Sequence, residues 1–188
     1  MGELQDSGEL GRGARVLDMG CGSGILSVAA LALGAGSATC VDVEAEALLT
    51  TQRNMELNFG DDADDRVELL HARQVVPCGL EPQDVAFANI LVGQLIRPSM
   101  VAVLATNLQP GGILCLSGIR PGDQCDTVRK AYAEWFEFDD DLYREADATA
   151  ETGGKEYWGR WGRLVGRRIK EKGLTSELIE NLSDAAVS

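Results

Sequence analysis

A glycine-rich segment near the start of the chain has the composition of a ligand-binding turn. From Val16 to Leu26 it reads VLDMGCGSGIL, with an acid at Asp18 and glycines at positions 20, 22 and 24. This string predicts a buried strand, a turn without bulky side chains and then a helix. A ligand can lie against such a bare backbone, and we expect the amides at the start of the helix to face it with the positive end of the helix dipole.

The spacing of the glycines separates two classes of ligand. Dinucleotide-binding proteins use G-x-G-x-x-G, whose turn holds a pyrophosphate. This chain has G-x-G-x-G, with the acid two residues before the first glycine. The pattern resembles the first motif of class I S-adenosylmethionine-dependent methyltransferases. That resemblance implies cofactor contacts at Asp18, Gly20, Cys21, Gly22 and Gly24.

A second acidic position follows at a suitable distance. The segment SATCVDVE, from Ser37 to Glu44, predicts a short strand that ends in acids, and Asp42 lies 22 residues after Gly20. A carboxylate at the tip of such a strand can accept hydrogen bonds from both ribose hydroxyls of an adenosyl ligand. Alternatively, Asp42 and Glu44 only cap the next helix, because acids favour a helix N-terminus. Motif and distance agree for Asp42, so we assign it to the ribose and Glu44 to capping.

Composition excludes several other classes of function. The chain has 188 residues, which suits one α/β domain, and its net charge of −13 argues against a domain that grips nucleic acid. No apolar run approaches the roughly 20 residues of a membrane span, and the first fourteen residues do not resemble a secretory signal. Five cysteines without a CxxC pair predict reduced thiols in the cytoplasm, and a single histidine excludes a histidine-rich metal site. We expect no metal, membrane or nucleic-acid partner.

Apolar strands and amphipathic helices alternate along the chain. Strands are predicted to begin at Val16 and Ser37, and to lie at 67–71, 84–90, 113–117, near 136–143 and near 158–165. The helix after the glycine turn is expected to have an apolar face formed by Ile25, Leu26, Ala29 and Leu33. A second helix, from about 45 to 58, is expected to keep Leu48, Thr51 and Met55 on one side. Together they predict a doubly wound, mostly parallel, seven-stranded Rossmann-like α/β sheet with ligands at the carboxyl ends of its strands.

The chain also divides into three segments. Residues 1–14 form a polar lead-in, 15–168 a catalytic domain, and 169–188 a tail that either forms one short helix or is frayed. Near the end of the domain, Trp161 and several arginines could suggest contact with RNA. The exposed face of a last strand explains the same pattern. The net negative charge of the chain favours this second interpretation.

The end of the predicted fourth strand carries the third polar position, Asn89, in the tetrapeptide Ala88-Asn89-Ile90-Leu91. Together with LDMGCGSGILS, VDVE and LQPGGILCLSGI, it closely resembles the ribosomal protein L11 methyltransferase family, from about Arg15 to Arg168. The resemblance implies a class I methyltransferase domain that uses S-adenosylmethionine to methylate lysine side chains and an N-terminal amine of a ribosomal protein. It also implies that Asn89 lies between cofactor and acceptor, as a catalytic and cofactor-binding residue. Alternatively, Asn89 only caps the next helix.

The chain departs from that family in two respects. Family members have a separate N-terminal recognition domain and, before the first strand, a loop of the form G-T-G-x-H-x-T-T. The residues before Arg15 do not match this loop, and the sole histidine is His71. The chain therefore looks like the catalytic half alone. We expect His71 to be a partly buried structural residue rather than a neighbour of the adenine.

The implied chemistry is an in-line displacement of a sulfonium methyl by a nitrogen lone pair. A lysine has an ordinary pKa of about 10.4, so the acceptor must become neutral, which desolvation favours. Asn89 is expected to orient the amine, and Asp18 to brace the turn and the amino acid end of the cofactor. The rival hypotheses are methylation of a small molecule or an RNA base, and a methyltransferase fold that binds a partner without catalysis.

Overall fold

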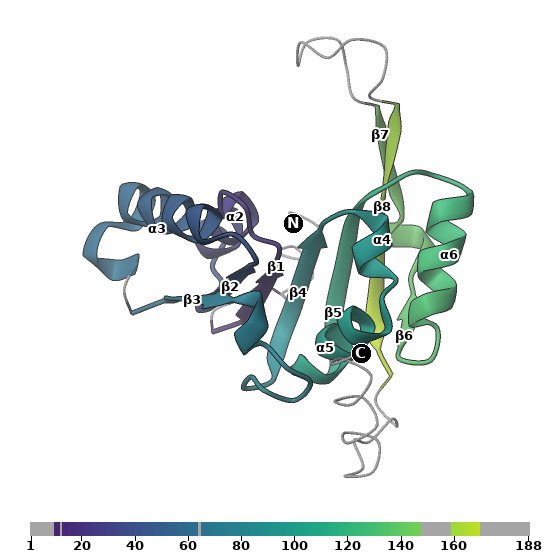
Figure 1. The fold of residues 1–188 in the computed structure, drawn as a ribbon, viewed down its shortest axis with the longest axis horizontal. Coiled ribbons are helices and arrows are strands. Elements are labelled where there is room, and N and C mark those ends of the chain that lie inside the picture. The colour runs from purple at the N-terminus through teal and green to yellow at the C-terminus, as the bar shows by residue number, and fades with distance from the viewer. Residues whose placement is uncertain (1–9, 12, 64, 148–158, 170–188) are drawn as a thin grey trace.

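One mixed β-sheet organises the chain in the computed structural model, which describes residues 10–11, 13–63, 65–147 and 159–169 (Figure 1). The strands follow the order β3-β2-β1-β4-β5-β8-β6, and β7 pairs with β8 off this path. Their bounds are β1 (Arg15–Met19), β2 (Ser37–Asp42), β3 (Val67–His71), β4 (Gln83–Asn89), β5 (Leu108–Ile119), β6 (Phe136–Phe138), β7 (Arg144–Asp147) and β8 (Arg160–Arg168).

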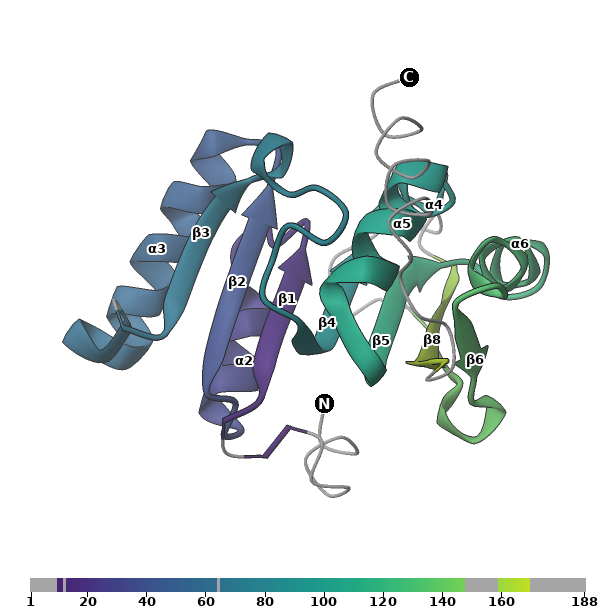
Figure 2. The same ribbon diagram turned by 90° about the horizontal axis from the view of Figure 1, so that it is seen from below.

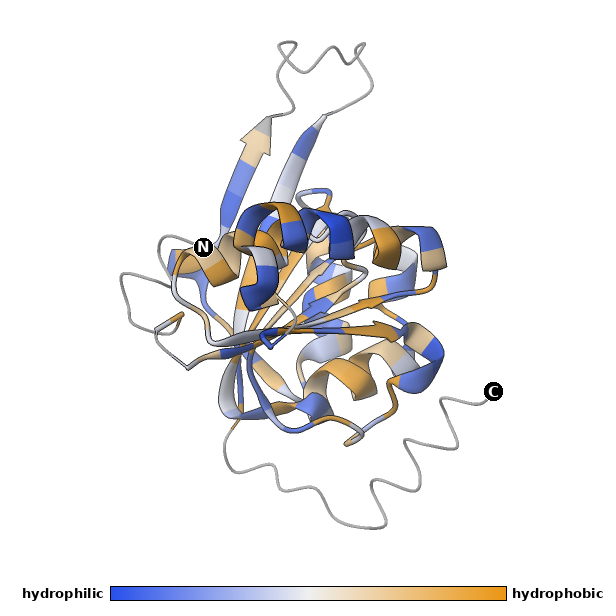
Figure 3. Cartoon of the chain, turned by 90° about the vertical axis from the view of Figure 1, so that its left-hand side faces the viewer, coloured by the Kyte–Doolittle hydropathy of each residue, from blue (hydrophilic) through white to orange (hydrophobic). Residues whose placement is uncertain are grey.

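The five strands from β1 to β5 are parallel, whereas β8 runs antiparallel to β5, β6 and β7. The predicted doubly wound, mostly parallel sheet is therefore confirmed, with seven strands on the main path. The segment predicted as one strand near 136–143 instead gives β6, the short helix η3 (Asp140–Leu142) and then β7. Strands β7 and β8 form a two-stranded ribbon that extends beyond the rest of the sheet (Figures 1 and 3).

Helices cover both faces of the sheet, as Figure 2 shows. They are α2 (Ile25–Ala32) and α3 (Ala45–Phe59) on one face, and α4 (Val92–Leu95), α5 (Pro98–Asn107) and α6 (Asp123–Tyr132) on the other. Successive residues of a strand point to opposite faces, so Val16 packs in the cluster under α2 and α3, and Leu17 in the cluster under α5 and α6. Figure 3 shows apolar residues along the strands, as a sheet covered on both faces requires.

The helices differ in how well their buried faces were predicted. In α3, Thr51 and Met55 are buried as expected. In α2 the prediction is wrong for Ile25, which is 65% exposed, while Ser27, Ala30 and Leu31 are the buried residues. Ile25 is the first residue of α2, directly after the glycine turn, and its side chain stays exposed there.

Some expectations fall outside the described residues. The lead-in up to residue 9 and the tail from 170 to 188 are among them. Within the described part of the chain, each helix is too short or too polar to cross a membrane.

A buried hydroxyl connects α6 to the helix that follows Asn89. Tyr132 is fully buried, and its hydroxyl donates a hydrogen bond of 2.9 Å to the Leu95 carbonyl oxygen in α4. We predict that Tyr132→Phe lowers the free energy of unfolding by about 1–2 kcal/mol, because a buried carbonyl loses its donor. Urea unfolding followed by circular dichroism measures the change. Tyr143→Phe, whose hydroxyl bonds to an exposed Glu145, is the control, and an equal loss in both variants would contradict this account.

Candidate functional site

The glycine turn adopts a backbone shape that other residues rarely take. Gly20, Gly22 and Gly24 have φ values of 76°, 56° and 74°. A Cβ at Gly20 would lie 2.2 Å from Ile90, and one at Gly24 would lie 2.7 Å from Thr51. At Gly22 a Cβ would meet nothing within 4 Å. The turn is therefore packed on both flanks and open at its middle glycine, where a ligand can approach the backbone.

Most amides of the turn are already used within the protein. The amides of Gly20 and Cys21 donate to a β2 carbonyl oxygen at 2.7 and 3.0 Å, and Gly24 donates to Cys21 at 2.8 Å. Gly22 donates to the Asp42 carboxylate at 2.9 Å. These turn amides are therefore occupied within the protein, and in the first turn of α2 the Ser27 amide donates to Asp18. A pyrophosphate is bound by amides of this kind, and the four turn amides are used within the protein.

Asp42 is fixed at the end of β2 by two backbone amides. One carboxylate oxygen accepts the bond from Gly22, and the other accepts a bond of 3.0 Å from Glu44. Glu44 occupies the N-cap position of α3, as predicted, but its side chain makes no capping hydrogen bond. The two bonds orient the half-buried Asp42 carboxylate beside the open glycine, and each oxygen keeps a further lone pair for a ligand.

Asp18 lies beneath the turn with one oxygen in use. It is 1% exposed, and its Oδ2 accepts bonds from the Ser27 amide at 3.2 Å and the Ser27 hydroxyl at 2.7 Å. Its Oδ1 is buried and has no hydrogen-bond partner among the described residues. Burial raises the pKa of Asp18, although the bonds from Ser27 act in the opposite direction. A buried acceptor without a donor is uncommon and suits a cationic ligand group.

Asn89 ends β4 at the same edge of the sheet. It pairs with Ser117 of β5, and its Oδ1 lies 2.7 Å from where a Cβ of Gly118 would be. The next residue, Ile90, packs on Gly20, so the end of β4 touches the glycine turn.

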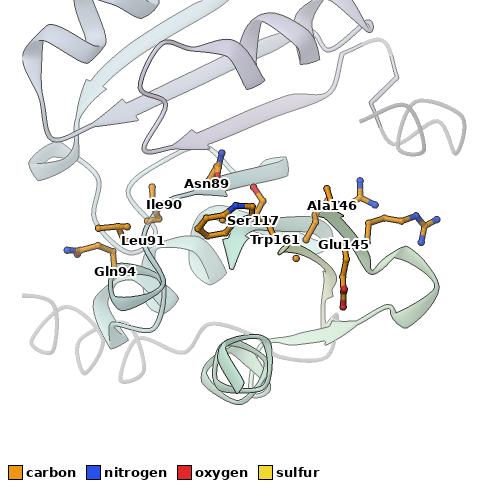
Figure 4. Close-up of a pocket in the computed structure, with 12 residues that line it drawn as sticks. Asn89, Ile90, Leu91, Gln94, Ser117, Glu145, Ala146 and Trp161 are labelled. Carbon is orange, nitrogen blue, oxygen red and sulfur yellow. The ribbon is translucent and has the colours of Figure 1, made fainter. Parts of the chain in front are cut away.

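A cavity of about 870 Å³ opens beside Asn89. Figure 4 shows its walls, which are built by the segment after β4, the end of β5 and the β7–β8 ribbon. The residues that line it are Asn89, Ile90, Leu91, Gln94, Ser117, Gly118, Arg144, Glu145, Ala146, Trp161, Gly162 and Arg163. The structure thus brings the predicted site residues to one edge, where Asn89 borders a cavity and Asp42 borders the turn.

The sequence of the chain matches the ribosomal protein L11 methyltransferase (PrmA) family over residues 4–149. The chain belongs to this family. A ribosomal protein L11 methyltransferase of Pseudomonas paraeruginosa is 40% identical over 168 residues, which are 88% of this chain and 49% of that protein. One of Chromohalobacter salexigens is 44% identical over 121 residues, which are 64% of this chain and 38% of that protein. The chain therefore spans less than half the length of these family members.

Solved structures agree with this family assignment. The crystal structure of a ribosomal protein L11 methylase from Lactobacillus delbrueckii subsp. bulgaricus has a TM-score of 0.62 at 25% identity, and the match covers 89% of this chain and 78% of that chain. A methyltransferase from Pyrococcus furiosus has a TM-score of 0.65 at 15% identity, with 89% and 81% covered. The second likeness shows the fold alone.

Two residues of α3, whose support of the glycine turn was not predicted from the sequence, hold this turn in this family member. Thr51 donates to the Gly22 carbonyl oxygen at 3.1 Å, and Asn54 donates to the Ser23 carbonyl oxygen at 2.8 Å. The Cys21 thiol lies 3.4 Å from the Thr51 hydroxyl and is buried, so the Cys21 side chain faces the interior. Thr51 and Asn54 are three residues apart on one helix face, which is the only sequence signal that could have indicated them.

The single histidine has a local structural role. The His71 Nδ1 accepts a bond of 3.1 Å from the Arg73 amide, and the His71 amide donates to the Gln74 side chain at 2.8 Å. These two bonds cap the short helix η2 (Ala72–Gln74). The interpretation of His71 as a partly buried structural residue is confirmed.

The buried Asp18 carboxylate should reduce the stability of the fold. Because burial raises its pKa, the folded state favours the protonated form, so folding loses stability as the pH rises from the ordinary aspartate pKa through the folded one. We predict that Asp18→Asn is more stable than the wild type at about pH 7, and that this advantage shrinks towards about pH 4. Urea unfolding at both pH values measures it. A variant that is less stable at pH 7 than at pH 4, relative to wild type, would contradict the sign.

Proposed function

We propose that residues 15–168 form the catalytic domain of an S-adenosylmethionine-dependent methyltransferase that acts on amino nitrogens of a ribosomal protein. Family membership supports the reaction and the protein substrate. The observation that carries the proposal is the bond of 2.9 Å between Gly22 and Asp42, because it puts a fixed carboxylate beside the one open glycine of the turn. A carboxylate in that position suits the ribose hydroxyls of an adenosyl group.

The residues present fit this cofactor in two further ways. The unpartnered Asp18 oxygen lies beneath the turn and suits the ammonium group at the amino acid end of the cofactor. Gly20, Gly22 and Gly24 give the ligand a surface without side chains, and Cys21 contributes its backbone only. S-adenosylmethionine, when bound, supplies a methyl group activated by a positively charged sulfur.

Asn89 is our candidate for orienting the acceptor amine. Its side-chain oxygen can accept a hydrogen bond from the amine, and its position over Gly118 limits where that oxygen lies. Ile90 and Leu91 add apolar surface that excludes water, which favours the neutral amine. The acceptor nitrogen is itself the nucleophile, so the protein contributes alignment, for which effective molarities of about 10⁵ M or more are possible.

The role of Asp42 is testable by binding alone. We predict that Asp42→Ala weakens S-adenosylhomocysteine binding by at least about 1.5 kcal/mol, roughly tenfold in Kd, because charge-assisted hydrogen bonds are lost. Isothermal titration calorimetry measures the change. Glu44→Ala is the matched control, because its exposed side chain makes no capping bond, and it should bind normally. Unchanged affinity in Asp42→Ala would remove this residue from the site.

A different result is expected for Asn89. We predict that Asn89→Ala lowers the methyl-transfer rate by about 10- to 100-fold and reduces S-adenosylhomocysteine affinity much less, because it mainly misaligns the acceptor. Single-turnover kinetics and calorimetry separate the two effects. Equal losses in rate and affinity would make Asn89 a cofactor residue only.

The proposed substrate is tested by transfer of a radiolabelled methyl group from S-adenosylmethionine. Purified ribosomal proteins and ribosomal RNA serve as separate acceptors for the chain as it stands. Label on an amine of a ribosomal protein supports the proposal, whereas label in RNA alone would overturn the substrate. An absence of both label and S-adenosylhomocysteine binding at millimolar ligand would instead favour a fold without catalysis.

A further inference from the structure

Two cysteine thiols lie against each other beside the glycine turn. Cys21 belongs to the turn, and its amide bonds to the Val41 carbonyl oxygen of β2 at 3.0 Å. Cys40 precedes Val41 in β2 and pairs with Asp18 of β1. Both cysteine side chains pack in the cluster under α2 and α3, and a hydrogen bond joins one thiol to the other. The pairing of β1 with β2 therefore brings together two thiols that are distant in sequence.

Each of the two thiols also contacts a hydroxyl group. The Cys21 sulfur lies 3.4 Å from the Thr51 hydroxyl, and the Cys40 thiol donates to the Ser27 hydroxyl oxygen at 3.2 Å. A thiol carries one hydrogen, so Cys40 can donate either to Ser27 or to the Cys21 sulfur. The second arrangement is favoured when Cys21 is a thiolate, because a thiolate accepts a hydrogen bond more strongly than a thiol does.

The two thiols differ in exposure and in how readily they lose a proton. Cys21 is 6% exposed, whereas Cys40 is fully buried. The hydrogen bond from Cys40 lowers the pKa of Cys21, although burial acts in the opposite direction. The same bond and burial raise the pKa of Cys40, so Cys40 keeps its proton. Because the thiolate is the reactive form of cysteine, Cys21 is the more reactive thiol and Cys40 supplies a second sulfur beside it.

Two other roles for this pair fit the structure less well. A buried cysteine can act only as a small apolar residue, but that role does not require one thiol to face another. A structural metal site usually takes four ligands. In the part of the chain that the structure describes, no group of three histidine, cysteine or acidic side chains is placed to hold a metal ion. Two adjoining sulfurs without further ligands are instead arranged as a disulfide requires.

We infer that Cys21 and Cys40 form a reversible disulfide on exposure to hydrogen peroxide, and that this disulfide weakens cofactor binding at the glycine turn. The Cys21 thiolate attacks a peroxide oxygen, so a sulfur–oxygen bond forms, the oxygen–oxygen bond breaks, and the leaving hydroxide takes up the proton that Cys21 released. The Cys40 sulfur then attacks the Cys21 sulfur. The disulfide bond forms, the sulfur–oxygen bond breaks, and the leaving hydroxide takes the Cys40 proton. The two thiols lose two electrons in total, and one peroxide is reduced to two waters.

The disulfide acts on the turn because Cys21 directly precedes Gly22, whose amide bonds to Asp42. Thr51 contacts both the Cys21 thiol and the Gly22 carbonyl oxygen. A covalent bond brings two sulfurs closer together than a hydrogen bond does, so the disulfide draws the Cys21 side chain away from Thr51 and towards β2. Gly22 and the Asp42 carboxylate are displaced with it. This effect on the cofactor rests on the proposed function, whereas formation of the disulfide does not.

Mass spectrometry of the whole chain tests whether the disulfide forms. The chain is treated with hydrogen peroxide, and the remaining thiols are then blocked with N-ethylmaleimide in denaturant. Trypsin cleaves after Arg15 and Arg53 and releases residues 16–53, which contain Cys21 and Cys40 and no other cysteine. This peptide should lose two hydrogens and take up no maleimide. Dithiothreitol, added before the block, should restore both maleimide sites.

Two variants separate this pair from thiols in general. Cys40→Ser lacks the second sulfur, so peroxide should oxidise Cys21 without the loss of two hydrogens from residues 16–53. Cys78→Ser removes an exposed thiol outside the pair and should form the disulfide as the wild type does. Absence of the two-hydrogen loss in the wild type, or its presence in Cys40→Ser, would overturn the inference.

Isothermal titration calorimetry with S-adenosylhomocysteine tests the effect on binding. Peroxide treatment should weaken binding by the wild type at least about tenfold, since the Asp42 carboxylate is displaced, and dithiothreitol should restore it. Cys40→Ser should lose less affinity under the same treatment. An equal loss in both proteins, or an unchanged affinity of the disulfide form, would overturn the effect on binding. If the reduced wild type binds no S-adenosylhomocysteine, the proposed function fails, while the peptide mass still decides whether the disulfide forms.

Discussion

The hydrogen bond from the Gly22 amide to the Asp42 carboxylate joins the glycine turn to the carboxylate at the end of β2. It forms because β1 and β2 are parallel neighbours, paired from Arg15 with Ser37 to Met19 with Val41, so that both strands end at the same level. A positive φ at Gly22 allows the chain to turn back towards β2 there. The bond requires both the sheet order and the glycine, and neither alone would place a carboxylate beside the bare turn.

A cost in stability accompanies this arrangement. Asp18 is removed from water, and only one of its oxygens has hydrogen-bond donors among the described residues. An unsatisfied buried polar group reduces the stability of a fold unless a ligand completes it. The partner of Asp18, Ser27, lies in the first turn of α2, so the same contact also fixes the helix that leaves the glycine turn. The buried Asp18 carboxylate therefore both lowers the stability of the fold and offers an acceptor to a ligand.

The parts of the structure that follow from local pattern could be predicted from the sequence. The strand at 67–71 was predicted with its observed bounds, since its short apolar run lies between polar segments. The positions of the glycine turn, Asp42 and Asn89 at one edge of the sheet followed from the alternation of strands and helices. The features that were not predicted depend on contacts with residues that are distant in sequence. Ile25 lies on the predicted apolar face of α2 but is exposed, and the Gly20 and Cys21 amides bond to β2; no local spacing indicates either feature.

Strand β7 was missed for a related reason, although the strand that became β8 was predicted near 158–165. Strand β7 has four residues, three of them charged, and so lacks the apolar alternation that identifies a strand. Its pairing depends on the position of β8 in the completed sheet.

The position of β8 in the sheet separates the ribbon from the elements that hold the glycine turn. Strands β1 and β2 and helix α3 hold the glycine turn, whereas β8 meets the parallel part of the sheet through β5. The ribbon wall can therefore change in sequence without disturbing Gly22 or Asp42. If the turn binds the methyl donor and the cavity admits the acceptor, as proposed, side chains of the ribbon can differ between acceptors while the backbone bonds at the donor site stay the same.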